Sequence, residues 1–200
     1  MKDDAKNKLQ IQKTPILVPG LKNITSLAAG ANHVLALDNK GNVLAWGAGE
    51  QSQLGRRVVQ RHRFNTLLPT RIGVTKAISI FAGSYHGFAL DSKGQVWGWG
   101  LNNFGQVGNV LGVGEESSSI DRAVIVEHLK SYKIHEIQGG NHHSIACTTN
   151  GTLLAWGRCD DAQIGIATEN LPQGDLLFDS RQKPRILRKP AIIPGEYVSD

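Results

Sequence analysis

The stretch that decides the fold is Ile24–Gly55, which reads ITSLAAGANHVLALDNKGNVLAWGAGEQSQLG. It recurs without a gap as Ala77–Gly108, 53 positions later, and as Ile134–Gly165, another 57 positions on. The positions that stay identical in all three copies are, numbered in the first, Gly30, His33, Ala36, Gly41, Trp46, Gly47, Gln53 and Gly55. Repetition at this period is typical of one supersecondary unit that is built several times and stacked.

Each copy is predicted to form three short strands. In the first copy Ile24–Ala29 and His33–Asp38 flank a turn, and Lys40-Gly41 forms a hairpin before Asn42–Gly47. Both faces of His33–Asp38 are largely apolar or small, which predicts a sheet that is covered on both sides. No segment shows sustained helical periodicity. We expect a fourth strand before each copy, around Pro15–Val18, Thr70–Gly73 and Ala123–Val126.

Small antiparallel sheets packed face to face around an axis form a β-propeller. The sequence therefore predicts an all-β fold, a partial β-propeller of three four-stranded antiparallel blades. Rings of this kind close with about four to eight blades, so we expect a segment of a longer chain. The expected units are residues 1–23 as a lead-in with the first strand of blade one, 24–76, 77–133 and 134–189 as three repeats with their connectors, and 190–200 as the start of a further repeat.

Composition narrows the functional classes. The 200 residues carry a net charge of +5, which favours acidic partners without identifying nucleic acid. Two cysteines indicate neither a disulfide framework nor a metal site, and a reducing compartment is expected. No apolar run reaches membrane-spanning length, and the N-terminus does not have the shape of a signal peptide.

Antiparallel pairing places two loops of each copy at the same end of its blade. The turn at Ala31-Asn32 joins the first two strands, and the third strand returns to that end and exits at Ala48–Glu50. Loops gathered on one face of a rigid scaffold are where binding residues usually lie. The corresponding residues of the three copies are Asn32, Tyr85 and His142 at the turns, with Glu50, Asn103, Asp160 and Arg158 at the exits.

The residue patterns argue against an enzyme, a metal site or a cofactor. His33, His86 and His143 occupy equivalent positions of successive blades, so rotation about the axis separates them, whereas metal ligands converge at about 2 Å. No phosphate-binding loop occurs, and no Ser/His/Asp set is evident. His142 differs from these histidines because its equivalents are Asn32 and Tyr85, so the repeat itself does not require a histidine there.

The three copies resemble the repeat of the regulator of chromosome condensation family, whose pattern is A-G-x-x-H-x-x-A-L, then G-x-V-x-x-W-G, then Q-x-G. The matching residues of the first copy are Ala29-Gly30, His33, Ala36-Leu37, Gly41, Val43, Trp46-Gly47, Gln53 and Gly55. The resemblance covers essentially the whole chain and implies a seven-bladed propeller. Proteins of this fold include Ran exchange factors, a plant ultraviolet-B photoreceptor, a β-lactamase inhibitor and modules of ubiquitin ligases.

Further stretches resemble the Ran guanine-nucleotide exchange factors of this family, particularly the fungal ones. These are Gly49–Arg56, Gly100–Gln106, Gly139–Ser144 and Gly157-Arg158. The resemblance implies a nuclear, chromatin-associated exchange factor, a regulator without a bond-making active site, whose partner is the small GTPase Ran. It implies that His142 and Arg56 engage Ran. Asn32 departs from the family, which often has Asp there, and an amide cannot supply that charge. The expected GTPase-binding set is His142, Arg56, Asn32, Tyr85, Asn103 and Arg158.

The connector Arg56–Arg63 matches a family loop that touches the acidic surface of the histone core. Arg57, Arg61 and Arg63 are therefore expected to bind histones. The family's β-hairpin wedge lies in the blade before the first copy, and Met1–Lys13 is expected to begin after it. No small-molecule substrate, cofactor or membrane is expected. The alternative function is a non-catalytic interaction module of a scaffold or ubiquitin-ligase protein.

Overall fold

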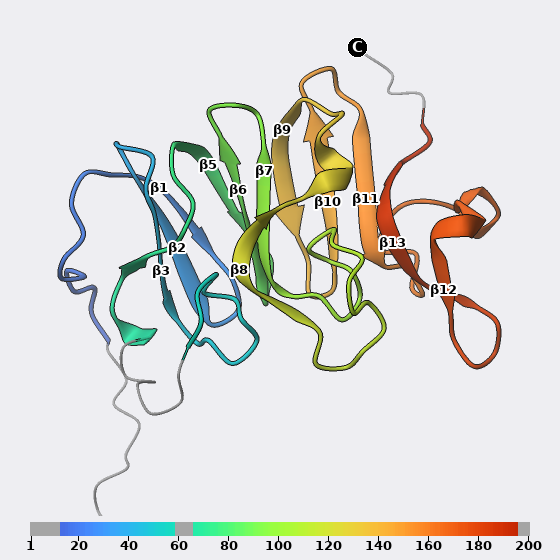
Figure 1. Cartoon of the computed structure of the whole chain (residues 1–200), viewed down its shortest axis with the longest axis horizontal. Coiled ribbons are helices and arrows are strands. Elements are labelled where there is room, and N and C mark those ends of the chain that lie inside the picture. Colours follow the sequence, from blue (N-terminus) through green and yellow to red (C-terminus); the bar gives the residue numbers. More distant parts are fainter. Residues whose placement is uncertain (1–12, 59–65, 196–200) are drawn as a thin grey trace, which may run out of the picture.

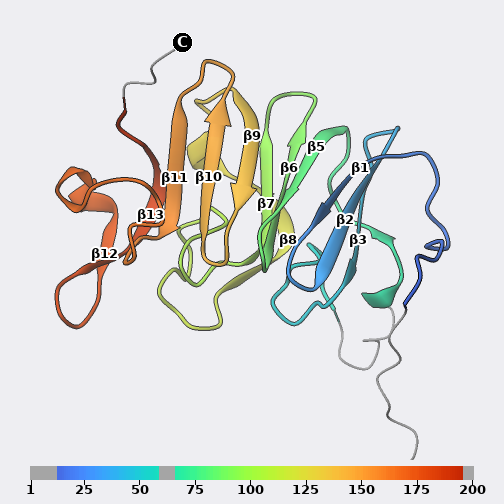
Figure 2. The same ribbon diagram turned by 180° about the vertical axis from the view of Figure 1, so that it is seen from behind.

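The computed structural model describes residues 13–58 and 66–195, and it shows three antiparallel sheets side by side (Figures 1 and 2). The first sheet has the order β1 (Ile24–Ala29), β2 (His33–Asp38), β3 (Val43–Gly47) and β4 (Thr70–Arg71). The second has β5 (Ala77–Ala82), β6 (His86–Asp91), β7 (Val96–Leu101) and β8 (Ser119–Ile125). The third has the order β9 (Ile134–Gly139), β10 (His143–Thr148), β11 (Leu153–Arg158), β13 (Pro184–Ile192) and β12 (Leu176–Phe178).

The helical content of the described residues is confined to short 3-10 turns in the connectors. They include η2 (Glu127–Leu129), η3 (Thr168–Asn170) and η4 (Gln173–Asp175). The prediction of an all-β fold built from three repeated antiparallel units is confirmed.

The fourth strand closes the sheet of the copy that it follows, so its expected place before each copy is wrong. Arg71 of β4 lies opposite Leu44 of β3, and Ile125 of β8 lies opposite Trp97 of β7. Ile192 of β13 pairs with Leu154 of β11, so residues 190–192 complete the third sheet instead of opening a further repeat. The physical reason is that the outer edge of each third strand has unpaired backbone N–H and C=O groups. The connector that follows the strand returns along this edge and forms hydrogen bonds with them. Pro15–Val18 form no strand.

The third sheet has five strands where four were expected. Leu176 and Leu177 of β12 pair with Leu187 and Ile186 of β13, whose opposite edge pairs with β11. The β12–β13 turn is held by the Asp179 carboxylate, which accepts the backbone N–H groups of Arg181 and Lys183 at 2.8 and 2.9 Å. Among the described residues, the other two sheets have no counterpart of this hairpin.

Much of the core lies between neighbouring sheets, and a further buried cluster lies between the third sheet and the connector that follows β11. Every residue of the middle strand β6 is buried. In β2, Leu35 is buried against the second sheet while Val34, on the opposite face, is half-buried. In β10 the pattern is reversed, since Ala146 is buried against the second sheet and Ile145 is half-buried.

A repeated tryptophan of one sheet bonds to a repeated glutamine of the preceding sheet. The buried Trp99 indole Nε1–H donates to the main-chain oxygen of Gln53 at 3.1 Å. In the same way Trp156 donates to the main-chain oxygen of Gln106 at 2.9 Å. These bonds satisfy the only polar atom of each buried indole and fix the stacking of successive sheets.

A buried polar network extends the second of these contacts. The Ser144 hydroxyl donates to the Gln106 main-chain oxygen at 2.8 Å, so its oxygen is left to accept from His86 Nε2–H at 2.9 Å. The repeated glycine Gly83 lies against this imidazole, because a Cβ there would overlap the ring of His86. The repeated His–Gly pair is therefore part of the scaffold.

Trp156→Phe is expected to lower the free energy of unfolding by about 2–3 kcal/mol, since it removes one buried hydrogen bond and leaves a cavity. The matched control is Trp46→Phe, at the equivalent half-buried position of the first sheet, where we expect about 1 kcal/mol or less. Urea unfolding followed by circular dichroism measures both. Equal losses for the two variants would contradict the assigned role of the Trp156 bond.

Acid is expected to destabilise the fold before its carboxylates titrate. Burial lowers the pKa of His33 to about 4 and that of His86 to about 3, from 6.5. Below pH 6.5 the unfolded chain binds protons that the native state does not bind, so stability falls with pH until the native values are reached. Each of these histidines should contribute roughly 1 kcal/mol of loss between pH 6.5 and 5.5.

Urea unfolding at pH 7.5, 6.5 and 5.5 measures this loss. His86→Gln keeps a hydrogen-bond donor but cannot be protonated, so its stability should depend less on pH than that of the unchanged protein. The same pH slope in both proteins would show that His86 does not carry the effect.

Candidate functional site

Three turns and three exit loops line the same edge of the three sheets, which is the lower edge in Figure 1. The backbone carbonyls of Asn32, Tyr85 and His142, at the turns, accept the N–H groups of Ala48, Leu101 and Arg158 at 2.7, 2.9 and 2.8 Å. Between sheets, Ala31 N–H donates to Ser84 O and Ser84 N–H to Gly140 O, both at 3.1 Å. We call this edge the loop face, and it comprises residues 31–32, 84–85, 141–142, 48–55, 101–108 and 158–165.

The glycine after each repeated tryptophan allows the turn and the exit loop to meet. Gly47, Gly100 and Gly157 have φ values of 111°, 102° and 102°, in the left-handed region that favours glycine. A Cβ on Gly100 would lie 2.5 Å from the main-chain oxygen of Tyr85, well inside contact distance. The three copies therefore hold their turns against their exits by the same geometry.

The repeated glutamines give the exit loops a common shape. The side-chain oxygens of Gln53, Gln106 and Gln163 accept the backbone N–H two residues earlier, at 2.8, 2.9 and 2.8 Å. The residues presented at these points are Gln51, Phe104 and Asp161. Three loops with the same backbone hydrogen bond thus carry three different side chains, so the surface differs from one blade to the next.

Phe104 is the centre of an aromatic and cationic cluster between the second and third sheets. Its ring centroid lies 4.8 Å from that of His142. The guanidinium carbons of Arg158 and Arg185 lie 5.4 and 5.3 Å from the same ring centroid, within the range of cation–π attraction. We refer to Phe104, His142, Arg158 and Arg185 as the Phe104 cluster.

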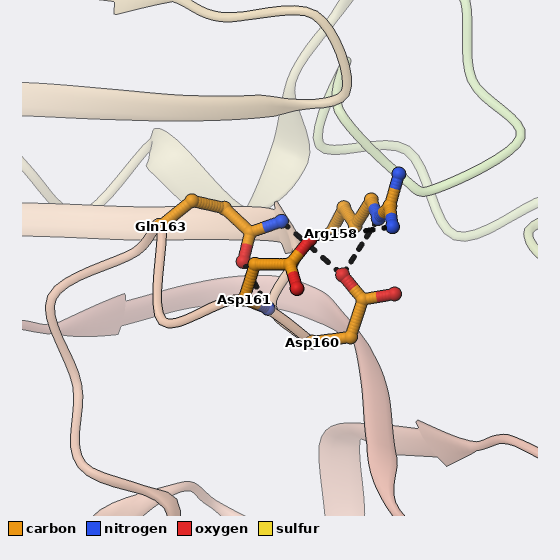
Figure 3. A network of polar contacts seen from close by, with 4 residues as sticks. All are labelled: Arg158, Asp160, Asp161 and Gln163. Atoms are coloured by element: carbon orange, nitrogen blue, oxygen red, sulfur yellow. Dashed lines mark hydrogen bonds and ion pairs between the residues drawn. The ribbon is translucent and has the colours of Figure 1, made fainter.

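Arg158 is held by acidic neighbours in its own exit loop (Figure 3). Its Nε–H donates to Asp160 Oδ1 at 2.6 Å, and its Nη2 lies 3.4 Å from Asp161 Oδ2. Gln163 Nε2–H also donates to Asp160 Oδ1, at 3.3 Å. Partial burial acts to raise the pKa of Asp160, but the bonds from Arg158 and Gln163 outweigh it and the pKa is lowered. Both partners of the pair are therefore charged at neutral pH.

His142 is neutral at physiological pH. Its side chain is half-buried, and burial lowers its pKa below 6.5, with further lowering by the positive charge of Arg158 and by His143. Asp160 opposes these effects only in part. The imidazole is therefore an uncharged hydrogen-bonding group on the loop face.

The other expected binding residues lie at several places on or beside the loop face. Asn32 is exposed, Tyr85 is half-buried, and Asn103 Oδ1 accepts a bond from Gln106 Nε2 at 3.1 Å. Arg56 is half-buried and lines an open cleft of about 620 Å³, together with Glu50, Arg57, Thr66 and Asp121. The structure thus gathers His142 and Arg158 in one cluster and places Arg56 and Arg57 at a separate cleft. Arg61 and Arg63 lie outside the described residues.

Two members of the Phe104 cluster were missed from the sequence as site residues. Phe104 could have been found by comparing the copies, because its equivalents are Gln51 and Asp161. Arg185 belongs to the hairpin of the third sheet, which has no equivalent in the described residues of the other copies, so the repeat held no signal for it.

Neither a metal centre nor a disulfide is found in the described part of the chain. Across residues 13–58 and 66–195, no three His, Cys, Asp or Glu side chains are placed to hold a metal ion. Cys147 and Cys159 are free thiols, and burial raises the pKa of Cys159 to about 11. No helix of these residues has the length and apolarity to cross a membrane.

The three stacked sheets form a partial β-propeller, with turns and exit loops gathered on one face. Residues 2–196 match the family model of the RCC1-like domain. The chain is 42% identical over 175 residues to Protein pim1 of Schizosaccharomyces pombe, covering 88% of this chain and 32% of pim1. It is 40% identical over 169 residues to the guanine nucleotide exchange factor SRM1 of Saccharomyces cerevisiae, covering 84% of this chain and 35% of SRM1.

The structural relatives agree with the sequence relatives. The crystal structure of Prp20p from Saccharomyces cerevisiae superimposes with a TM-score of 0.85 at 38% identity, over 92% of this chain and 42% of Prp20p. The chain belongs to the family of RCC1-like domains, as the repeats led us to expect. It spans about a third of the length of the curated relatives that it matches.

The His142 imidazole should titrate below pH 6.5 in the folded protein, because burial and Arg158 both disfavour its charged form. NMR of the ring protons across pH 5–8 measures this. Arg158→Gln removes the neighbouring positive charge and is expected to shift the titration upward. A midpoint above 6.5 in the unchanged protein would contradict the neutral assignment.

Proposed function

We propose that this protein acts as a guanine-nucleotide exchange factor for the small GTPase Ran. The observation that carries the proposal is His142, held half-buried and neutral on the loop face at a position where the other copies have Asn32 and Tyr85. The family supports it, because SRM1, 40% identical to this chain, is a guanine nucleotide exchange factor. Prp20p was solved together with a study of its binding to Gsp1p (Ran) and histones.

The mechanism needs no bond-making chemistry. A protein that binds nucleotide-free Ran more tightly than nucleotide-loaded Ran must, by linkage, weaken nucleotide binding by the same factor. The ratio of GTP to GDP in the cell then sets the direction of exchange. We assign the differential contacts to the loop face and the residues beside it, namely His142, Arg56, Asn32, Tyr85, Asn103 and Arg158.

A second proposed contact is with histones, which would keep the protein on chromatin in the nucleus. Arg57 is exposed beside the 620 Å³ cleft. Its expected companions Arg61 and Arg63 lie outside the described residues. Guanidinium groups fork onto carboxylates, so a basic connector suits an acidic histone surface.

We prefer exchange to the alternative of a passive scaffold module because SRM1, which is 40% identical to this chain, is a named exchange factor. Both functions would use the loop face as a docking surface. Acceleration of nucleotide release distinguishes them, since a scaffold would bind a partner without changing its affinity for nucleotide.

Release of fluorescently labelled GDP from Ran, with other small GTPases as a specificity panel, tests the proposal. The full-length protein that carries this sequence should accelerate release from Ran selectively. His142→Ala should reduce that acceleration roughly 5- to 100-fold, the range for loss of a central interface contact.

The control is His128→Ala. His128 lies in η2, directly after Val126, whose N–H bonds to Val96 O at the hairpin end of the second sheet, opposite the loop face. This variant should leave release unchanged. No acceleration by the unmodified protein would reject the proposed function. Normal acceleration by a folded His142→Ala variant would remove His142 from the binding set.

A further inference from the structure

The two junctions between sheets have the same backbone design but different side chains on the loop face. At the first junction the exit loop presents Gln51, the adjoining turn presents Tyr85 and the next exit begins with Leu101. At the second junction the equivalent residues are Phe104, His142 and Arg158. The first junction therefore presents three uncharged side chains, whereas the second presents a phenyl ring, an imidazole and a guanidinium.

The loop beneath Phe104 holds the ring in place. Phe104 N–H donates to Gln106 Oε1 at 2.9 Å. The fully buried Asn102 accepts from Val107 N–H at 3.1 Å through Oδ1 and donates to Asn109 O at 2.8 Å through Nδ2. Because these bonds are buried or partly buried, the ring projects from a rigid loop.

The two arginines of the cluster come from paired strands of the third sheet. Arg158 ends β11, opposite Ile186 of β13, and Arg185 precedes Ile186. The Arg185 carbonyl accepts Cys159 N–H at 2.9 Å, which fixes its backbone beside the exit loop. Register thus brings both guanidinium groups to one phenyl ring, although they reach it from different strands.

The two guanidinium groups differ in what else they contact. Arg158 is neutralised by Asp160 and Asp161. Arg185 is exposed, and within residues 13–58 and 66–195 no carboxylate forms an ion pair with it. A guanidinium that packs on an aromatic ring keeps its edge N–H donors available for a carboxylate.

We propose that Phe104 is a positioning residue of the loop face. It orients Arg185 so that its guanidinium N–H groups donate to a carboxylate side chain of the bound GTPase, and it holds His142 beside that contact. The inference rests on the proposed exchange function. It adds that an acidic side chain of the GTPase contacts the second junction.

A double-mutant cycle on the full-length protein tests whether Phe104 acts through Arg185. Phe104→Gln gives the second junction the residue of the first, and Arg185→Gln removes the charge while keeping a polar side chain. Each should weaken binding to nucleotide-free Ran about 10-fold, and the double variant should lose little more than either single one. Phe104→Tyr keeps the ring and should stay within about 2-fold of the unchanged protein.

A readout on the protein alone separates this inference from the function. In Phe104→Gln the NMR titration of His142 should move up toward 6.5, because the ring that buries the imidazole is gone while Arg158, His143 and Asp160 remain around it. Thermal melting confirms that the variant is folded. An unmoved titration, or losses from Phe104→Gln and Arg185→Gln that multiply, would overturn the positioning role even if exchange is observed. Failure of the unchanged protein to bind Ran would instead reject the proposed function and the assigned partner, with the titration still reporting on Phe104.

Discussion

The hydrogen bond from a buried indole to a glutamine main-chain oxygen is the constraint on which the rest of this structure depends. Gln106 shows why, because it takes part in both stacking and loop shape. Its main-chain oxygen accepts from Trp156 and Ser144 of the next sheet, while its side-chain oxygen accepts from Phe104 N–H in its own exit loop. The position of one sheet on the next and the shape of the loop face are therefore set by the same residue.

This coupling separates the residues that build the fold from those that distinguish one blade from another. The repeated Trp and Gln residues make the same contact at both junctions between sheets, as the bonds of Trp99 and Trp156 show. The varied residues stand at the turns and at the exposed points of the exit loops. A substitution at these exposed positions of the turns and exit loops changes the surface and leaves the stacking intact, which allows one scaffold to serve different partners.

The sequence was sufficient to predict the three strands of each copy and the grouping of the turns with the exits, because gap-free repetition and a period of two fix both. It could not decide which sheet the fourth strand joins, since β4 is only two residues long and both neighbouring edges offer unpaired backbone groups. The strand β12 has three residues and no copy elsewhere in residues 13–58 and 66–195. Arg185 reaches Phe104 only through the register of β13 on β11, and register between distant segments is a tertiary property.

Rigidity of the loop face matters for the proposed exchange function because the contacts must work against the affinity of the GTPase for its nucleotide. A mobile loop would lose part of its interaction free energy to ordering, by about 0.5–1.5 kcal/mol for each side chain that is immobilised. Here the turns are bonded to one another across the sheets through Ser84, and the Phe104 ring is fixed by bonds within its loop. These loops are therefore ordered before the partner binds. The free energy of their contacts can then favour the nucleotide-free state of the partner, because none of it is lost to ordering the loops.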